Sequence, residues 1–233
     1  FKTRIYDDRF KNTLDSYDDA NYSTQTKASA FQSNYNDYTY GGNLEYHTQF
    51  IPKNDLKIAF HFKEDVHREN NLGEPVRRFV DNTILIGIED VYKISNHFTL
   101  IPGVSYNIRK NKKAEDYNTG TKVISDYPAA AASDAFNTQI GLFYKLNDDQ
   151  KLGATVSQKT RFATIKDLYS YRMGTAIPNP DFKPEKATNY EINYTANAFN
   201  KVTFQTAVFY SVLSDAILNV SNVQPGKSQM QNF

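Results

Sequence analysis

The sequence predicts an all-β protein, an antiparallel transmembrane β-barrel segment in which about eight or nine strands are visible. Three observations predict this class. Apolar and polar residues alternate with a period of two along most of the chain. Short and long connections alternate between these stretches along the chain. The composition is rich in aromatic residues, with 17 Tyr and 16 Phe, and it contains no cysteine.

The expected strands follow one another along the chain. Their ranges are 38–50, 56–65, 83–94, 98–109, 137–145, 151–159, 189–197 and 202–210, with a partial strand at 1–6. In each strand one face is mainly apolar and the other mainly polar. In chain order, the apolar faces contain Tyr38, Tyr40, Leu44, Tyr46; Leu56, Ile58, Phe60, Phe62; Ile84, Ile86, Ile88; Phe98, Leu100, Val104, Tyr106, Ile108; Ile140, Leu142, Tyr144; Leu152, Ala154, Val156; Tyr190, Ile192, Tyr194; Val202, Phe204, Val208 and Tyr210.

The connections alternate in length. Short turns are expected at 52–55, 95–97, 147–150 and 199–201, and long loops near 64–78, 110–135 and 163–187. A run of alanines suggests a short helical turn within 129–135. Tight turns at one end and long loops at the other are typical of bacterial outer-membrane barrels. A strand as long as 38–50 extends about 43 Å, which is enough to cross the apolar band when tilted.

Charge and composition exclude several other classes. Lys and Arg total 27 and Asp and Glu total 26, so the net charge of +1 gives no footprint for nucleic acid. No apolar run is long enough for a membrane-spanning helix. The absence of cysteine excludes disulfides and thiolate metal sites. No nucleophile set, phosphate-binding loop or cofactor motif is visible, so we expect neither an enzyme nor a bound cofactor.

The segment 176–191 carries a more specific signal. It resembles the barrel motif of TonB-dependent outer-membrane receptors, and 38–42, 65–69, 100–106 and 207–217 also resemble barrel segments of that family. The Asn- and Tyr-rich character is similar to receptors of Bacteroidetes-type bacteria. The prolines of the motif stiffen the path from a loop into a strand, so we expect a structural role for it. The motif residues are Asn179, Pro180, Asp181, Lys183, Pro184, Glu185, Asn189, Tyr190 and Glu191.

The resemblance implies a larger plugged barrel in the outer membrane of a Gram-negative bacterium. Residues 1–233 would be an internal or C-terminal part of one barrel domain, with the plug domain absent from this chain. Such a receptor lies among outer-membrane lipids and engages TonB through its plug. Its solute would be an iron–siderophore complex first, with cobalamin or an oligosaccharide as alternatives.

Two other interpretations stay open at this point. One is a small complete outer-membrane barrel of eight strands with a structural or adhesive role, and the other is a soluble β binding module. Both predict a self-contained barrel. The receptor interpretation instead predicts unpaired strand edges at 1–6 and 202–211.

Candidate ligand contacts lie on the loop 163–175 and on the second strand. Lys166, Tyr169, Tyr171 and Arg172 combine aromatic rings with cations, which suits an anionic siderophore or a sugar, although an ordinary solvated loop is the simpler interpretation. His61 and His67 share a strand face with Asp65. That spacing spreads the three groups over about 20 Å, so we expect no metal site there.

Overall fold

The computed structural model describes residues 1–27, 30–128, 132–170, 175–198 and 202–233, and these residues form β-structure with one short helix among them. None of the helical residues in these ranges forms a segment long and apolar enough to cross a bilayer. The elements are β1 (Lys2–Ser16), β2 (Phe31–Thr48), β3 (Leu56–Asn71), β4 (Arg77–Asp90), β5 (Tyr92–Lys93), β6 (Phe98–Asn118), β7 (Val123–Asp126), β8 (Ser133–Lys145), β9 (Gln150–Arg161), α1 (Ile165–Tyr169), β10 (Ala176–Ile177), β11 (Glu185–Ala198), β12 (Val202–Ser214), β13 (Ile217–Gln224) and β14 (Lys227–Asn232).

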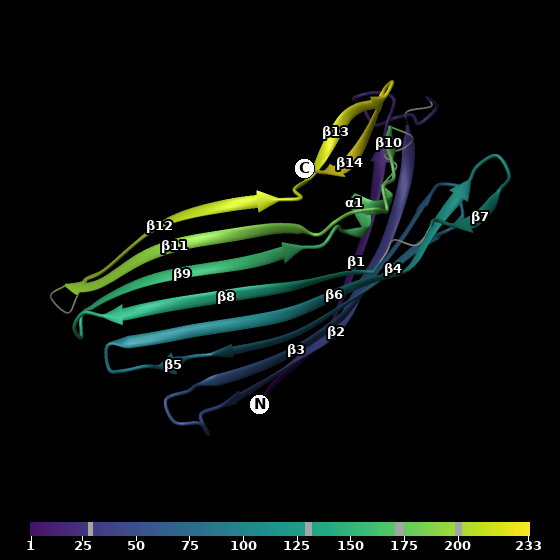
Figure 1. Cartoon of the computed structure of the whole chain (residues 1–233). Helices are drawn as coiled ribbons and strands as arrows, with labels where there is room; N and C mark the ends of the chain where they lie inside the picture. Colours follow the sequence, from purple (N-terminus) through teal and green to yellow (C-terminus); the bar gives the residue numbers. More distant parts are fainter. Residues whose placement is uncertain (28–29, 129–131, 171–174, 199–201) are drawn as a thin grey trace.

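The main feature is one curved antiparallel sheet whose spatial order repeats the chain order (Figure 1). The order is β1-β2-β3-β4-β6-β8-β9-β11-β12, and β5 and β7 each pair with β6. Consecutive strands joined in this way form an up-and-down meander. In the part of the chain that the structure describes, β1 and β12 lie at opposite ends of the order and do not pair with each other. The sheet is therefore open, as predicted for a receptor segment and unlike a self-contained barrel.

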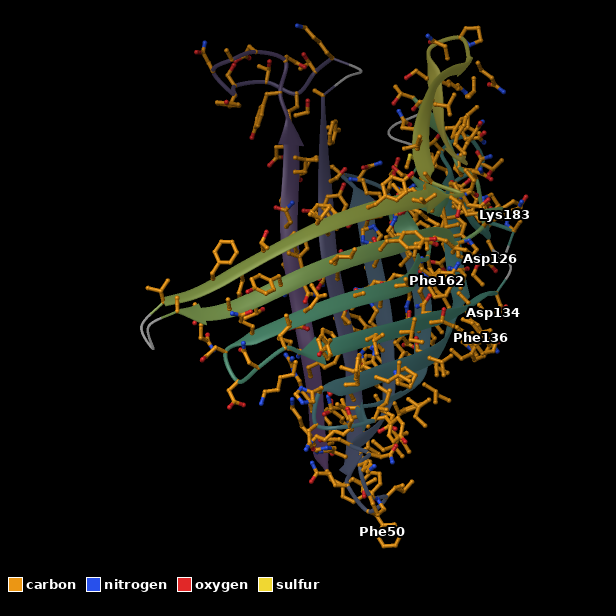
Figure 2. All side chains as sticks on the ribbon, turned by 60° about the vertical axis from the view of Figure 1, so that its left-hand side comes forward. Phe50, Asp126, Asp134, Phe136, Phe162 and Lys183 are labelled. Carbon is orange, nitrogen blue, oxygen red and sulfur yellow. The ribbon has the colours of Figure 1, made fainter. Side chains whose placement is uncertain are left out.

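The two ends of the sheet differ, as the connection lengths predicted. At the turn end, 49–55 and 146–149 join neighbouring strands directly. At the loop end lie α1, β7, β10 and the hairpin of β13 and β14 (Figure 1). Figure 2 shows Phe50 at the turn end, far from Asp126 and Lys183 at the loop end. The expected turn at 199–201 lies outside the described residues.

Several strands extend farther toward the loop end than predicted. The partial strand at 1–6 is a full strand, β1, which pairs with β2 from Lys2 to Ser16. The loop expected at 64–78 shrinks to 72–76, because β3 continues to Asn71 and β4 begins at Arg77. Regular alternation disappears from these extensions, because polar residues on both faces outnumber isolated apolar ones such as Val66 and Phe79, yet the backbone hydrogen bonds continue.

Two predictions about loops are wrong. The expected loop 110–135 contains the end of β6 and all of β7, and Ser133 already begins β8, so 133–135 is not helical. Residues 129–131 of that expected helical turn lie outside the described residues. Residues 217–232, where no strand is expected from the sequence, form the hairpin of β13 and β14 around Gly226, whose φ of 70° suits glycine. Polar sequences such as 217–232 carry no apolar alternation from which these strands could be predicted.

On the outer face of the sheet, apolar residues of neighbouring strands lie opposite one another. Ile58 lies opposite Ile88 and Phe60 opposite Ile86, and the alternation continues across the other strands. Phe60 is 43% and Ile86 53% exposed, so no other element covers this face in the described residues. A soluble sheet would bury such a face, whereas a membrane barrel turns it toward lipid.

Aromatic side chains gather at both margins of this apolar band. This is the girdle pattern of membrane barrels, in which amphipathic rings sit at the water interface. Toward the loop end the ring pairs are Tyr38–Tyr40, Tyr106–Phe136 and Tyr190–Tyr210, and toward the turn end they are Phe1–Tyr46 and Phe98–Tyr144. The pairs therefore mark where the band ends on either side.

The inner face is polar and interrupted by glycines. At Gly153 a Cβ would lie 2.4 Å from Asn193 Oδ1 and 2.6 Å from the Phe143 ring, so a larger residue would force these side chains to shift. Phe143 lies directly opposite Gly153 and covers its bare backbone. The Lys151 ammonium sits 4.3 Å from the centre of the same ring.

Candidate functional site

The inner face carries a network of paired charges at mid-height. Asp65 and Asp81 lie directly opposite each other on β3 and β4. The Thr39 hydroxyl donates to Asp65 at 2.8 Å, and the Lys63 ammonium lies 2.8 Å from the same carboxylate. Two facing carboxylates repel, so each needs its own cation. For Asp65 that cation is Lys63.

Asp81 is the most enclosed of these charges, at 0% exposure. It forms an ion pair with Arg109 on β6, and the Asn111 amide donates to it at 2.9 Å. A buried carboxylate is stable only with such partners. Asp81, Arg109 and Asn111 also line a small cavity closed by Phe162 and Phe182. The pairing fixes the position of these groups and leaves little free charge at this height.

A second cluster surrounds His67, closer to the loop end. Its Nδ1 lies 2.9 Å from Asp37 and its Nε2 3.2 Å from Glu69. Both partners are acceptors, so an imidazolium with two N–H donors satisfies both contacts. Glu69 also pairs with the almost fully buried Arg77 at 3.1 Å. His67 therefore acts as a bridge between β2 and β3.

A row of rings continues from His67 across the inner face. Tyr35 and Phe79 flank the His67 ring at 5.8 and 5.7 Å between centres. Phe79 contacts Tyr169 of α1 at 5.7 Å, and Tyr169 contacts Tyr127 at 5.4 Å. Phe79 and Tyr169 are each 3% exposed and belong to the principal apolar core. The row thus anchors α1 against the inside of the wall.

Helix α1 is short but well capped. The Thr164 hydroxyl accepts the Asp167 amide, and the Asp167 carboxylate accepts from the Thr164 amide at 2.9 Å. This reciprocal pair of hydrogen bonds is a capping box. It provides acceptors for backbone N–H groups in the first turn, which have no partner within the helix. Arg161, the last residue of β9, lies 3.2 Å from the same Asp167 carboxylate. The helix is thereby tied to the strand that precedes it.

The motif found in the sequence holds the loop-end segments together. Arg161 binds both carboxylate oxygens of Glu185, at 3.0 and 3.3 Å, and Glu185 accepts the Ile217 amide at 2.9 Å. The Asn179 side-chain amide donates to the Met230 carbonyl at 2.9 Å. The Lys183 backbone N–H donates to Asn232 Oδ1, and the Lys183 carbonyl accepts from the Asn232 side-chain amide. We call these contacts of 179–185 with β9, β13 and β14 the clip.

The remaining motif residues lie near the clip or on β11. Asn179 Oδ1 accepts the Asp181 amide at 3.2 Å, which closes a local turn beside Pro180. Asn189 and Glu191 point to the inner face and Tyr190 to the outer face. Asn189 accepts from Ser211 at 2.7 Å, and Glu191 accepts from Asn193 at 3.0 Å. Pro184 precedes the first residue of β11.

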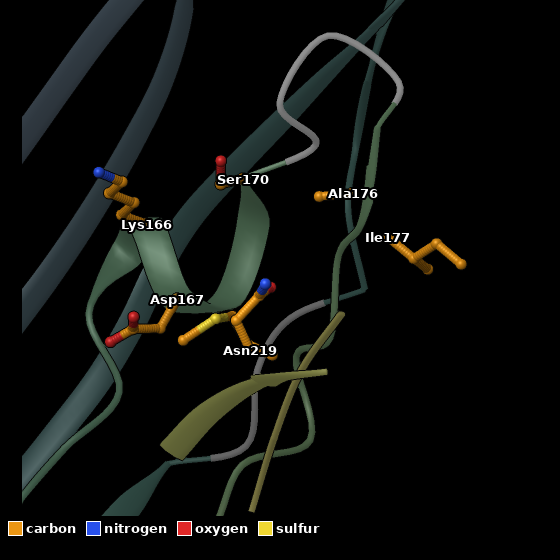
Figure 3. Close-up of a pocket in the computed structure, with 7 residues that line it drawn as sticks. Lys166, Asp167, Ser170, Ala176, Ile177 and Asn219 are labelled. Atoms are coloured by element: carbon orange, nitrogen blue, oxygen red, sulfur yellow. The ribbon is translucent and has the colours of Figure 1, made fainter. Parts of the chain in front are cut away.

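A small cavity of about 40 Å³ opens between α1 and the β10–β14–β13 sheet (Figure 3). Its walls combine one cation, one carboxylate and several neutral groups. The lining residues are Lys166, Asp167, Ser170, Ala176, Ile177, Asn219 and Met230. Lys166 is exposed, whereas the Asp167 carboxylate is already held by the cap and by Arg161. Of the two charged residues that line the cavity, Lys166 is therefore the one whose side chain is exposed and able to contact a solute.

The residues singled out in the sequence fall into different surroundings. Lys166 lines the cavity, while Tyr169 is packed inside the core. His61 lies 2.9 Å from the Tyr6 hydroxyl on the inner face, away from His67. Tyr171 and Arg172 lie outside the described residues. Within the described ranges, no three His, Asp or Glu side chains are grouped as a metal site would require.

Other inner-face groups were not among those singled out. They include Asp37, Glu69, Arg77 and Asp81, each of which lies on the same face as the histidines. The signal available was a titratable side chain at every second position along 63–69, which single-strand patterns do not distinguish from an ordinary hydrated wall.

Comparisons with known proteins agree with this geometry. The family model described as TonB dependent receptor-like, beta-barrel matches residues 2–233. No curated protein gives a significant sequence match. Among solved structures, the copper transporter OprC is 17% identical with a TM-score of 0.78, and the alignment covers 99% of this chain and 38% of that one.

Two further solved structures are similar. The FrpB iron transporter from Neisseria meningitidis (F3-3 variant) is 15% identical with a TM-score of 0.69, and 99% of this chain covers 35% of it. The ferric citrate transporter FecA is 15% identical with a TM-score of 0.63, and 85% of this chain covers 31% of it. At these identities the likeness shows the fold alone. This chain spans well under half the length of each of the three.

Proposed function

Because the chain belongs to the TonB-dependent receptor β-barrel family, we propose that it forms part of the wall of an outer-membrane receptor that binds a scarce solute outside the cell and passes it inward. The observation that carries this proposal is the two-faced sheet. Its outer face is an exposed apolar band between aromatic girdles, and its inner face is polar. At the loop end, α1 and the clip fold against the inner side, where a solute would arrive.

The proposed solute is an iron–siderophore complex. Lys166 supports an anionic solute, because it is an exposed cation that lines the small cavity, while the one carboxylate of the lining, Asp167, is held by Arg161 and Thr164. Iron and copper transporters among the structural neighbours support a metal complex. Cobalamin and an oligosaccharide are the rival solutes.

The rest of the proposal concerns the whole receptor. It places the receptor in the outer membrane of a Gram-negative bacterium of Bacteroidetes type. A plug domain would fill the lumen and engage TonB. The family consists of receptors and transporters, and the proposal includes no enzymatic step.

The test is a binding titration on the full-length receptor in detergent, against ferric siderophores, cobalamin and oligosaccharides. Saturable binding is expected for one ferric siderophore. Lys166→Ala should weaken it about tenfold, as expected for a lost charge-assisted contact. Lys122→Ala is the matched control, because Lys122 is an exposed cation at the same end in the turn between β6 and β7.

The outcomes separate the alternatives. Binding of cobalamin or an oligosaccharide would keep the receptor and replace the solute. Equal losses in the two lysine variants would show that Lys166 is no specific contact. Absence of binding to all three classes would contradict the proposed function.

A further inference from the structure

Two arginines face each other on the outer side of the wall. Arg68 of β3 lies directly opposite Arg78 of β4. Both occupy the even-numbered positions of their strands, the same face as Phe60 and Ile86. Like charges placed opposite each other on neighbouring strands repel. The pair is therefore unfavourable unless an anion lies between the two guanidinium groups.

Both side chains turn toward one tyrosine on β2. The Arg68 guanidinium carbon lies 5.2 Å from the centre of the Tyr38 ring, and Arg78 Nη2 lies 3.4 Å from the Tyr38 hydroxyl. The Arg68 Nε donates to the Asn36 carbonyl at 2.8 Å, which fixes the orientation of its guanidinium. The two guanidinium groups and the Tyr38 hydroxyl thus lie together. Their N–H and O–H donors can bind several oxygens of one anion.

The neighbouring carboxylates are occupied elsewhere. Glu64 accepts the Tyr40 hydroxyl at 2.6 Å. Glu115 lies 2.5 Å from the Lys113 ammonium and accepts the Arg78 backbone amide at 2.7 Å. Within the described ranges, neither Arg68 nor Arg78 has a carboxylate within ion-pair distance. The counter-anion must therefore come from outside this part of the chain.

The height of the pair identifies the kind of anion. On β3 the outer-face residue level with the girdle ring of Tyr38 is Val66, and Arg68 follows two residues later, about 7 Å along the strand. With a strand tilt near 40°, that is roughly 5 Å beyond the girdle, within the headgroup layer of about 5–8 Å on each side of the hydrocarbon core. The Tyr38 ring lies opposite Val66, so the guanidinium groups lean back toward the membrane. The loop end is the extracellular end of such a barrel, so the pair lies at the level of outer-leaflet headgroups.

We propose that Arg68, Arg78 and Tyr38 form a site on the outer wall for the phosphate of an anionic lipid headgroup in the outer leaflet. The phosphate oxygens accept from both guanidinium groups, and the acyl chains lie along the apolar band below. The bound phosphate neutralises the facing arginines and strengthens the pairing of β3 with β4. This inference rests on the membrane position proposed above and is independent of the transported solute.

The test is native mass spectrometry of the full-length receptor, released from nanodiscs of phosphatidylcholine, which is zwitterionic, with about 20% phosphatidylglycerol or lipid A, which supply an anionic phosphate headgroup. The variant Arg68→Gln/Arg78→Gln is compared with Lys110→Gln/Lys112→Gln. The control removes two cations from β6 at the same end of the wall. The arginine variant should lose one tightly retained anionic lipid, with about tenfold weaker retention, and the control should retain it. Inorganic phosphate at millimolar concentration should not displace the lipid.

Each other outcome contradicts the proposal in a different way. Equal lipid retention by the arginine variant and the wild type would overturn the site. Displacement by inorganic phosphate would assign the site to a free anion. Should the glutamine variant fail to fold, Arg68→Lys/Arg78→Lys replaces it, and unchanged retention there would show that the guanidinium forks are unimportant. Solute affinity, measured on the same samples, reports separately on the proposed function.

Discussion

Replacing Glu185 by alanine should open the clip at β13. Glu185 makes two kinds of contact whose contributions can be separated. It accepts two hydrogen bonds from Arg161, and it accepts the amide of Ile217, whose residue is only 6% exposed. The Arg161 side chain is 45% exposed, so solvent screening limits that ion pair to about 0.5 kcal/mol. A buried amide left without an acceptor costs roughly 1–3 kcal/mol.

The two terms together predict a loss of about 2 kcal/mol in the local opening free energy, or roughly 30-fold in the opening equilibrium. Glu185→Gln keeps an oxygen for the Ile217 amide and loses only the charge, so it should change the equilibrium about twofold. Hydrogen exchange of a peptide covering residues 215–220 in the full-length protein measures both effects. Lys183→Ala is the control, because its side chain is exposed while its backbone makes the clip contacts.

The reasoning is refuted by either of two results. Exchange within twofold of wild type in Glu185→Ala would mean that the Ile217 amide does not depend on the carboxylate. Equal effects of alanine and glutamine would mean that the charge dominates, contrary to the estimate from exposure.

Three further predictions concern the wall and one connecting loop. Gly153→Val should destabilise the fold by about 1–3 kcal/mol, because the new Cβ would clash with Asn193 and Phe143. A urea titration of the folded barrel, followed by its mobility shift on unheated gels, measures this change. An unchanged unfolding midpoint would contradict the close contact of Gly153 with these side chains. Ile86→Arg on the outer face should cost about 2–4 kcal/mol in lipid, whereas Gln139→Arg on the inner face, beside Glu89, should cost much less, and equal costs in the same titration would argue against a lipid-facing band. Hydrogen bonds from the Thr26 amide and its neighbours lower the pKa of Asp18 to about 2, so the order of residues 17–27 should persist above pH 4 and be lost as the pH falls from about 4 toward 2. A spin label at Tyr22 reports that transition, which Asp18→Asn should abolish; a transition of the same midpoint in the variant would exclude Asp18 as its origin.

The clip shows how far local sequence signals reach. The prolines and turn-forming residues of 178–184 identify a rigid entry into β11 without any structure, because proline restricts the backbone locally. The partners of that entry are distant in sequence. The Ile217 amide and Asn232 meet the motif only after the sheet has brought β9, β12 and the hairpin together. A polar hairpin such as 217–232 has no periodic apolar pattern from which its strands could be predicted.

Candidate ligand residues illustrate the same division. Lys166 and Tyr169 are three residues apart and equally plausible as solute contacts from the sequence. In the fold one lines the cavity and the other is buried against Phe79, because the face of α1 that turns toward the wall is decided by packing. The facing arginines on β3 and β4 could not be recognised either, since their pairing depends on strand register.

The sequence by itself determined the strand class, the assignment of apolar and polar faces and the difference between the two ends. These properties follow from a period of two and from turn residues, which act over a few neighbouring positions. Only the tertiary structure decided how far the strands extend beyond the apolar band, which charges pair across the inner face and what the clip joins. Those outcomes depend on backbone ladders and side-chain contacts between segments up to about 50 residues apart, as between Asn179 and Met230, and no local pattern encodes them.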